Sequence, residues 1–594
     1  MLNRKILSCL LAVALLLCGC TDPSVTPSSP DIPTNPTDPV TGETITLPQN
    51  AIDPSGLFSD RDLAGTFDTT GTVITFTGST AEISGAGATL SGSTVIISQE
   101  GTYILRGTME NGMVLVSADS SAKVQLVLDT VSIHSATSAP IYVRNADKTF
   151  ITLAPGSTNV LSNGGSFVAV DDNNIDAVIF SKDDLTINGS GSLTITSPAG
   201  HGIVSKNELT VTGGSYDITA ASHGMTGEDS ICITAASLQI QAGKDGLQAE
   251  NDEDTEKGYV YIKDGSLNIT CDGDGISATG FMQIDGGTFT VTAGGGYING
   301  QQHSSDDWGG GMGPGGRPGG RPRSGTSSDT SDTSTSAKGF KADGVLIVNG
   351  GEFTLDTADD TFHSGGDLTV TGGTITLSSG DDGFHSDAML HIAGGTVTIH
   401  HSYEGLEGLS IAVSGGNITI TASDDGMNAA GGSDQSGFGP GGRPGGFEAS
   451  SDSFVAISGG TVYVRAGGDG IDSNGALTVT GGHITIHGPT QGDTSVLDYG
   501  SIGTISGGTF IGTGAMNMAV TFNKAENQGI ISVSIGGNLP AGTEVKLTDA
   551  DGNVVISTTP ADSFAIVILS CPQMVKGQTY TLTVGELSKT FTAE

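Results

Sequence analysis

The sequence predicts an all-β fold and, within that class, a single-stranded parallel β-helix. Segments such as "DLTVTGGTITLSSGDDGFHSDA" and "MLHIAGGTVTIHHSYEGLEGLS" recur with a period of about 22 residues. Each unit reads as a strand, a Gly-Gly turn, a second strand and an acidic glycine turn. Threonine, valine and isoleucine alternate with period two in the strands, and no amphipathic helix pattern separates them. Strand-only units of this length are typical of coils that stack on one another.

The N-terminus carries an export signal. Two positive charges in Met1–Lys5 precede the apolar run "ILSCLLAVALLL", and "LCGC", which resembles a lipobox, ends at Cys20. This pattern predicts a lipoprotein signal peptide over residues 1–20, too short to remain as a spanning helix, with lipidation at Cys20. The Pro/Thr/Ser-rich residues 21–48 indicate a solvated tether. We therefore expect an extracytoplasmic lipoprotein that is anchored to the cell membrane and exposed at the cell surface.

The rest of the chain divides into three parts. Residues 49–180 carry the strand pattern weakly and are expected to form N-terminal β coils. Residues 181–514 carry the clear repeats, with insertions at 297–337 and 433–452 that contain glycine- and arginine-bearing stretches. Beyond them the period stops, and residues 515–594 are expected to form a small antiparallel β unit that caps the open end of the coils.

Composition limits the partners and the cross-links. The formal net charge is −41, which excludes nucleic acid as a partner, because binding it requires a basic patch. Divalent cations, or sugars held through cations, suit this charge better. Cys232, Cys271 and Cys571 are scattered, which predicts buried small side chains rather than a disulfide framework. We expect the chain to act as a monomer.

Aligning the repeats produces a column of mostly acidic residues. Equivalent residues of stacked coils lie about 4.8 Å apart, and two unit charges at that distance repel by roughly 3–4 kcal/mol at an effective dielectric constant of about 20. Such a column needs a bridging cation, and oxygen-only ligand sets suit Ca²⁺. The residues before the turn glycine are His201, His223, Asp245, Asp274, Lys338, Asp360, Asp382, Glu404, Asp425 and Asp469.

The metal interpretation competes with a simpler one. Aspartate before glycine is a common turn former, because it caps turns and tolerates unusual backbone angles. A single Asp-Gly pair is explained by the turn alone, whereas the aligned set favours metal binding. An ion pair with Asp274 or Asp360 would explain Lys338 inside the column. The strongest metal candidates are the acidic pairs Asp359, Asp360, Asp381, Asp382, Asp424 and Asp425.

Two further columns follow the acids. The second residue after each acid is apolar, from Ile203 to Ile471, and is expected to point into the core. The third is polar and includes Lys341, His363 and His385. The two histidines are candidates either for sugar contacts or for exposed polar positions, and the sequence leaves both open.

Several ordered motifs are shared with a known family. They include "FSDRDL" (58–63), "NDEDTEKGYVYI" (251–262), "SAKGFKADG" (336–344), "SYEGLEG" (402–408) and "SDDGMNAAGG" (423–432). Over roughly residues 50–594 the chain resembles bacterial extracellular carbohydrate-binding proteins with a right-handed, pectate-lyase-like parallel β-helix. The resemblance implies cellulose or polygalacturonate binding with bound calcium. Carried over to this sequence, the acidic turns fall on Asp245, Asp274, Asp360, Asp382, Glu404, Asp425 and Asp469, and the "KGxK" turn falls on Lys338 and Lys341.

Three functions follow from these patterns. The first is a surface-anchored protein that binds plant cell-wall-type polysaccharide (polygalacturonate, pectin or cellulose) through calcium. Its substrate-contact candidates are Lys338, Lys341, His363, His385 and Arg465. The second is a pectate-lyase-like enzyme in which calcium assists β-elimination and Lys338, Lys341 or Arg465 acts as the base. No recognisable catalytic motif is present, so no catalytic residue is assigned. The third is a surface adhesin whose calcium only rigidifies the coils.

Overall fold

The computed structural model describes residues 37–39, 44–45, 51–300, 336–429, 453–490, 494–516 and 518–594. Over these ranges the regular secondary structure is nearly all β-strand, with one five-residue helix, α1 (Asp60–Ala64), and one 3-10 turn, η1 (Tyr297–Asn299). The all-β prediction is confirmed. Residues Thr34–Glu594 form one compact unit. No described helix has the length and apolar character needed to cross a membrane.

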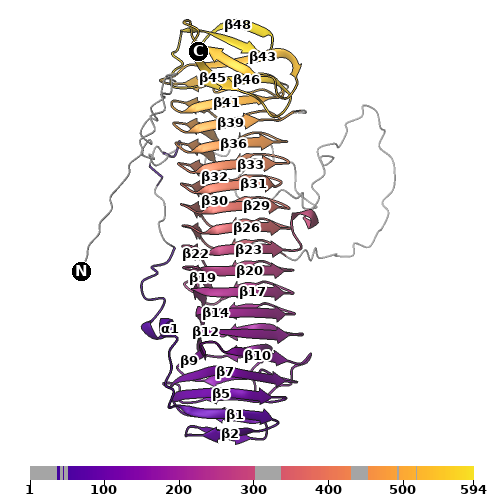
Figure 1. Ribbon diagram of the computed structural model, residues 1–594. Coiled ribbons are helices and arrows are strands. Elements are labelled where there is room, and N and C mark those ends of the chain that lie inside the picture. Colours follow the sequence, from indigo (N-terminus) through magenta and orange to yellow (C-terminus); the bar gives the residue numbers. More distant parts are fainter. Residues whose placement is uncertain are drawn as a thin grey trace, which may run out of the picture. The chain divides into compact units, whose positions relative to one another are not determined.

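Most strands belong to one large mixed sheet of 44 strands, in which repeats lie one on the next (Figure 1). One repeat comprises β26 (Glu352–Thr357), β27 (Phe362–Ser364) and β28 (Leu368–Val370). β26 pairs in parallel with β29 (Thr374–Ser379) of the following repeat. β27 and β28 both pair in parallel with β30 (Phe384–Ile392). Each repeat is therefore hydrogen-bonded to the next along three separate ladders.

The ladder that follows the acidic turns positions the candidate site. Its strands pair in parallel, each with the equivalent strand one repeat later. They are β13 (His201–Ser205), β15 (Met225–Gly227), β18 (Leu247–Ala249), β21 (Ile276–Ala278), β24 (Phe340–Ala342), β27, β30, β32 (Leu406–Val413), β34 (Met427–Ala429) and β37 (Asp472–Ser473).

The register of this ladder pairs identical residue types on successive strands. Phe340, Phe362 and Phe384 are partners in successive strands, and their rings stack with centroids 5.0 and 4.8 Å apart. All three side chains are fully buried. The apolar column predicted from the sequence is thus confirmed as core, since burial of such rings is the main favourable term in folding. The three downstream cysteines are also buried and free, as predicted.

Both ends of the large sheet contain antiparallel pairs. At the N-terminal end β1 (Thr72–Gly78) pairs antiparallel with β2 (Ala81–Ser84) and parallel with β5 (Gly101–Met109). At the other end β46 (Phe564–Ser570) lies antiparallel to β41 (Thr509–Gly514) and also pairs with β43 (Ile530–Leu539). A second, four-stranded sheet contains β44 (Val545–Thr548), β45 (Val554–Thr558), β47 (Thr579–Val584) and β48 (Leu587–Thr592).

The segment before β1 is held against the repeats by hydrogen bonds and an ion pair. Ser59 caps α1 through a reciprocal hydrogen-bonded pair with Asp62. The Asp62 carboxylate also accepts a 2.6 Å hydrogen bond from the Thr186 hydroxyl and lies 3.0 Å from the Lys148 ammonium. Further upstream, the Gln283 side-chain oxygen accepts the backbone N–H groups of residues 51 and 52. Residues 51–62 are therefore tied to several separate repeats.

Candidate metal centre

The acidic turns are held in register by backbone hydrogen bonds between repeats. The residue after each acid donates its N–H to the carbonyl oxygen of the acid one repeat later. Gly383 donates to Glu404 at 3.0 Å, and Gly405 donates to Asp425 at 3.0 Å. Gly426 continues the series to Asp469 at 2.9 Å. The column expected from sequence alignment is therefore a real spatial column, with one acid per repeat.

The side chains of the column cap the backbone of the following repeat. One oxygen of Asp360 accepts the N–H of Asp382 at 3.1 Å, and one oxygen of Asp382 accepts the N–H of Glu404 at 3.2 Å. Asp245 caps Asp274 in the same way, at 2.8 Å. A buried backbone N–H needs an acceptor, and here the acid of the preceding repeat supplies it. For these aspartates the turn interpretation thus accounts for one carboxylate oxygen and leaves the second oxygen for another partner.

Four acids in the middle of the column, Asp274, Asp360, Asp382 and Glu404, are buried. Asp360 and Asp382 are 2% and 3% exposed. Burial, reinforced by neighbouring carboxylates, raises the pKa of Asp382 and Glu404 well above the ordinary range. Burial and the charge of Asp245 raise the pKa of Asp274 to about 6. The carboxylates turn inward over the next repeat instead of projecting outward, so they repel one another strongly unless positive charge lies between them.

Lys338 supplies such a charge at one step of the column. Its ammonium lies 2.7 Å from a carboxylate oxygen of Asp360 and 2.9 Å from one of Asp359, and its side chain is 9% exposed. Burial opposes the charge on Lys338, but the two aspartates outweigh it and raise the lysine pKa. Lys338 and His363, in turn, hold the pKa of Asp360 far below its ordinary value despite burial. The expected ion pair with Asp360 is present, and it shows that a cation satisfies this position.

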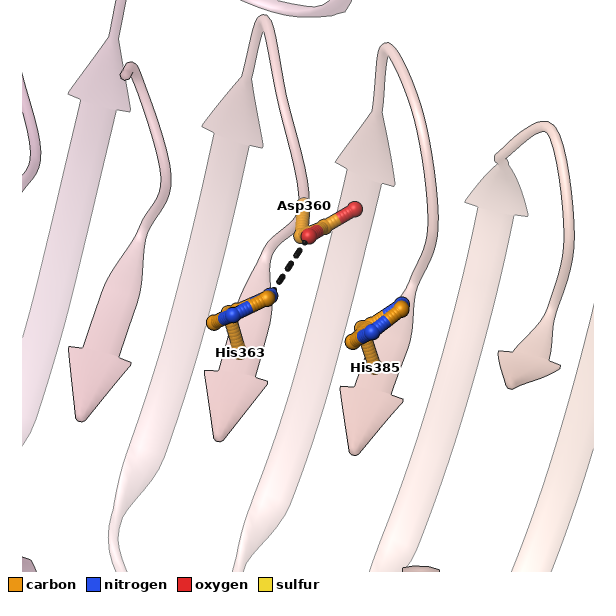
Figure 2. Close-up of side chains that lie close together, drawn as sticks. All are labelled: Asp360, His363 and His385. Carbon is orange, nitrogen blue, oxygen red and sulfur yellow. Dashed lines mark hydrogen bonds and ion pairs between the residues drawn. The ribbon is translucent and has the colours of Figure 1, made fainter. Parts of the chain in front are cut away.

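On β27 and β30, two histidines lie beside carboxylates of the column. His363 Nδ1 lies 2.9 Å from Asp360 Oδ2, and its ring stacks on that of His385 with centroids 4.8 Å apart (Figure 2). His385 Nδ1 lies 2.6 Å from Glu407 Oε2 and 3.3 Å from Asp382 Oδ2. Because His385 is only 1% exposed, the interpretation of this residue as an exposed polar position is wrong.

A second cluster contains only oxygen ligands. Asp425, Asp469 and Asp472 each offer a carboxylate oxygen, and these atoms lie within 4.8 Å of one another. The three side chains are half-buried. Burial, with nearby carboxylates, raises the pKa of Asp469 to about 7 and that of Asp472 to about 6. Within the described ranges none of the three forms an ion pair, so the cluster combines excess negative charge with partial access to solvent.

Between these clusters two polar atoms are buried without a partner. The Asn428 side-chain amide donates to Glu404 Oε1 at 2.7 Å. Glu404 Oε2 and Asn428 Oδ1 are buried and accept no hydrogen bond from the part of the chain that the structure describes. An unsatisfied buried acceptor is costly, and here two of them lie on adjoining repeats.

The first repeats of the column differ chemically from the later ones. The rings of His201 and His223 stack with centroids 5.1 Å apart, and His223 Nδ1 accepts the backbone N–H of Asp245 at 3.3 Å. Burial lowers the pKa of His201 to about 4, so its imidazole is neutral near pH 7. Histidine therefore takes over the capping role of the acids here without adding negative charge, and these repeats have little need of a cation.

The remaining candidate residues lie in other environments. Lys341 Nζ is 3.6 Å from an Asp343 carboxylate oxygen. The Arg465 guanidinium donates two hydrogen bonds, of 2.7 and 2.8 Å, to Asp562. Lys338 and His385 are buried, so the structure does not present them to a polysaccharide, contrary to their assignment as substrate contacts. Cys20 and most of both insertions lie outside the described residues.

Sequence reasoning missed Glu407 and Asp472 as members of the clusters, and Asp387 as a neighbour of His385. A usable signal was present, because Glu407 and Asp472 each stand three residues after an acid of the column. The same spacing relates His385 to Asp382. Each acid begins a turn and the third residue lies on the short strand that follows, so both point to one side of the turn. The two columns together therefore form one set of candidate ligands.

Comparison with known proteins places these features in a family. The model of the carbohydrate-binding domain-containing proteins matches residues 91–383 and 382–543. A protein of that description from Acetivibrio thermocellus is 40% identical over 128 residues, which is 21% of this chain and 45% of the relative. The chain thus spans less than half of that relative.

A solved structure, titled as a polysaccharide lyase-like protein from C. thermocellum in a gadolinium derivative, is 35% identical. That match covers 38% of this chain and 92% of the other, with a TM-score of 0.37. Since the family model matches more than half of the sequence, the chain belongs to the family of carbohydrate-binding domain-containing proteins.

Proposed function

We propose that the protein is a surface-anchored, calcium-dependent carbohydrate-binding protein for acidic polysaccharide of the plant cell-wall type, polygalacturonate or pectin, with cellulose as a second substrate class. Family membership implies a polysaccharide partner. The observation that carries the calcium part is the cluster of Asp425, Asp469 and Asp472, whose oxygens converge at half-buried positions. Lipidation at Cys20 is the anchor in this proposal.

The fold part of the proposal is a right-handed parallel β-helix closed by a C-terminal β cap. The three parallel ladders that join each repeat to the next support the β-helix. The antiparallel pairing of β46 with β41 supports the cap, because it covers a strand edge that would otherwise be open to another chain.

The cluster fits calcium by the chemistry of its donors. Asp425, Asp469 and Asp472 offer only carboxylate oxygens, which a hard cation prefers, and Asp424 is adjacent in sequence. Burial favours protonation of Asp469 and Asp472, and a divalent cation would instead compensate their charge. When bound there, calcium would supply positive charge for the carboxylate of a uronate unit. The chain itself contributes the half-buried position, so the three side chains keep partial contact with solvent.

The lyase alternative requires a base that can take up a proton. Lys338 is a buried ammonium whose pKa is raised by two aspartates, and Arg465 is paired with Asp562. Both cations hold their protons tightly, which opposes the role of general base. Lys341 is the remaining candidate of the three, and its ammonium lies near Asp343. Binding without cleavage is therefore the function that the geometry supports best.

The test is the affinity of the full chain for polygalacturonate in calcium and in EDTA, with absorbance of unsaturated uronate followed at the same time. We expect calcium-dependent retention with constant absorbance. Retention that is unchanged in EDTA would refute the calcium bridge, and rising absorbance would identify a lyase. No retention in either condition would leave calcium, if bound, as a structural element of an adhesin.

A double variant tests the assigned cluster. Asp469→Asn with Asp472→Asn removes two charges, while the side-chain oxygen of the first introduced asparagine could still cap Ser495, whose N–H Asp469 accepts. We expect polygalacturonate affinity in calcium to fall at least tenfold. Asp549→Asn with Asp551→Asn is the matched control, because it changes net charge equally in an exposed turn far along the sequence. Equal losses in both double variants would mean that total charge, and not this cluster, determines binding.

A further inference from the structure

His385 lies at the centre of a fully enclosed set of possible metal ligands. Asp382, His385 and Glu407 each place one donor atom within 4.8 Å of the others, and all three side chains are buried. Asp382 Oδ2 and His385 Nδ1 are 3.3 Å apart. Two ligands of a tetrahedral zinc ion, with bonds of about 2.0–2.2 Å, are separated by roughly 3.3–3.5 Å. The shorter distance of 2.6 Å from Nδ1 to Glu407 Oε2 fits a proton in the place of the ion.

The orientation of His385 matches that of a metal ligand. Its second ring nitrogen, Nε2, lies 3.2 Å from Asp387 Oδ1, while Nδ1 faces Asp382 and Glu407. Histidines that bind metals usually donate the other ring N–H to a carboxylate, which fixes the ring and makes the metal-facing nitrogen a better donor. Asp387 holds that outer position on the same strand, β30.

The stacking of the two histidines shows why only one of them belongs to this site. The rings of His363 and His385 lie 11° from parallel on neighbouring strands (Figure 2). The lone pair of an imidazole nitrogen lies in the plane of the ring, so two parallel rings cannot direct their lone pairs at one ion. His363 is paired with Asp360, whose charge Lys338 already compensates. The set around Asp382 has no lysine or arginine partner among the described residues.

A second observation concerns Glu404, which stands three residues before Glu407. Glu404 is nine-tenths buried, and its Oε2 accepts no hydrogen bond within the described chain. After burial, the charge of Glu407 is the main cause of the raised pKa of Glu404, which places the two carboxylates in one electrostatic cluster. Among the described residues, Asp382 and Glu407 have the His385 imidazole as their ion-pair partner, and Glu404 adds a further carboxylate beside Glu407.

We propose that Asp382, His385 and Glu407 form a binding site for a divalent transition-metal cation of the zinc class, separate from the calcium cluster. A mixed set of one nitrogen and two oxygens suits such an ion, because imidazole favours zinc, copper, nickel and iron over calcium. The site goes beyond polysaccharide binding, and its enclosed position gives the ion a role in joining the repeats around β30 and β32 rather than in contacting a sugar.

The experiment is a zinc titration of EDTA-treated, dialysed full chain in competition with a chromogenic chelator, with calcium in large excess. We expect wild type to bind zinc at least tenfold more tightly than His385→Gln. His391→Gln is the matched control, since His391 is also buried on β30 but pairs with Ser414. It should bind zinc like wild type. Equal zinc affinity in wild type and His385→Gln, or full displacement of zinc by calcium, would overturn the proposal.

A second measurement avoids dependence on the folding of the variant. Wild type loaded with one equivalent of Cu²⁺ should show coupling to the remote imidazole nitrogen in pulsed EPR. Absence of nitrogen coupling would mean that the bound ion has oxygen ligands only, and would overturn the assignment. Because no polysaccharide is present, either result is independent of calcium-dependent binding to polygalacturonate, so the two proposals fail separately.

Discussion

Replacing Lys338 by methionine tests whether the acidic column needs a cation at each step. Methionine has a similar length and fills the same space, so the packing changes little while the ammonium disappears. Asp359 and Asp360 then lose partners at 2.9 and 2.7 Å. With the lysine side chain only 9% exposed, screening by solvent is weak. Removing one member of a buried ion pair costs about 3–5 kcal/mol, because the other charge stays buried without compensation.

Calcium should restore part of that loss. Asp359, Asp360 and Asp381 form an oxygen-only cluster with donor atoms within 4.8 Å of one another. In wild type the lysine ammonium neutralises part of it. In Lys338→Met the cluster resembles that of Asp425, Asp469 and Asp472, so a divalent ion can take the place of the ammonium. We expect destabilisation in EDTA and recovery when calcium is added.

Hydrogen exchange followed by mass spectrometry is the suitable assay, because a repeat chain of this length need not unfold in one step. A local loss of about 3 kcal/mol raises exchange of the protected amides in residues 336–364 roughly a hundredfold. Residues 201–223 serve as the internal reference, since histidines hold the column there. Unchanged exchange in EDTA would refute the need for a cation, and failure of calcium to restore protection would refute the exchange of one cation for another.

Three further predictions concern other parts of the chain. Burial alone would raise the pKa of Asp62, but hydrogen bonds and the Lys148 charge lower it. The stability lost in Asp62→Asn, measured by chemical unfolding, should therefore be largest above about pH 4 and shrink as the pH falls below that; a difference that does not change on acidification would contradict this. Phe362→Ala should cost about 3–5 kcal/mol, because the ring is fully buried between two others; a melting temperature within error of wild type would show that the stack collapses without loss. Arg465→Gln should leave polygalacturonate affinity within twofold of wild type, since Asp562 already engages the guanidinium, and a larger loss in a retention assay would restore Arg465 as a sugar contact.

The repeat made much of the fold predictable from sequence. Once the units were aligned, parallel pairing of equivalent residues followed, and Phe362 with Phe384 and His363 with His385 are indeed register partners. The alignment has this power because side chains alternate strictly along a strand, so a shift of one residue would turn the phenylalanines outward. The column of acids was predictable for the same reason.

Burial of the acids was not predictable in that way. Whether a carboxylate projects outward or turns over the next repeat depends on which backbone N–H lacks an acceptor, and that is a property of the turn in three dimensions. Asp382 illustrates this, because one oxygen caps Glu404 while the other faces His385. Sequence spacing predicted the neighbours of Asp382 but not the direction of its side chain, and the direction decides between a surface for sugars and an enclosed ion site.

The two oxygens of each capping aspartate connect the fold to the proposed ions. One oxygen accepts an N–H of the following repeat, as Asp425 does from Asp469 at 2.5 Å, and the other is left for a cation. Removing the cation does not remove the cap, so the repeats can stay stacked while the charge in the column rises. Lys338 provides an ammonium at one step, and at the first steps His201, whose imidazole is neutral near pH 7, and His223 stand in place of acids. Both proposed ions therefore belong to the later repeats, where we propose that the half-buried cluster of Asp425, Asp469 and Asp472 takes a ligand-bridging ion and that the buried set around His385 takes an ion that only the protein contacts.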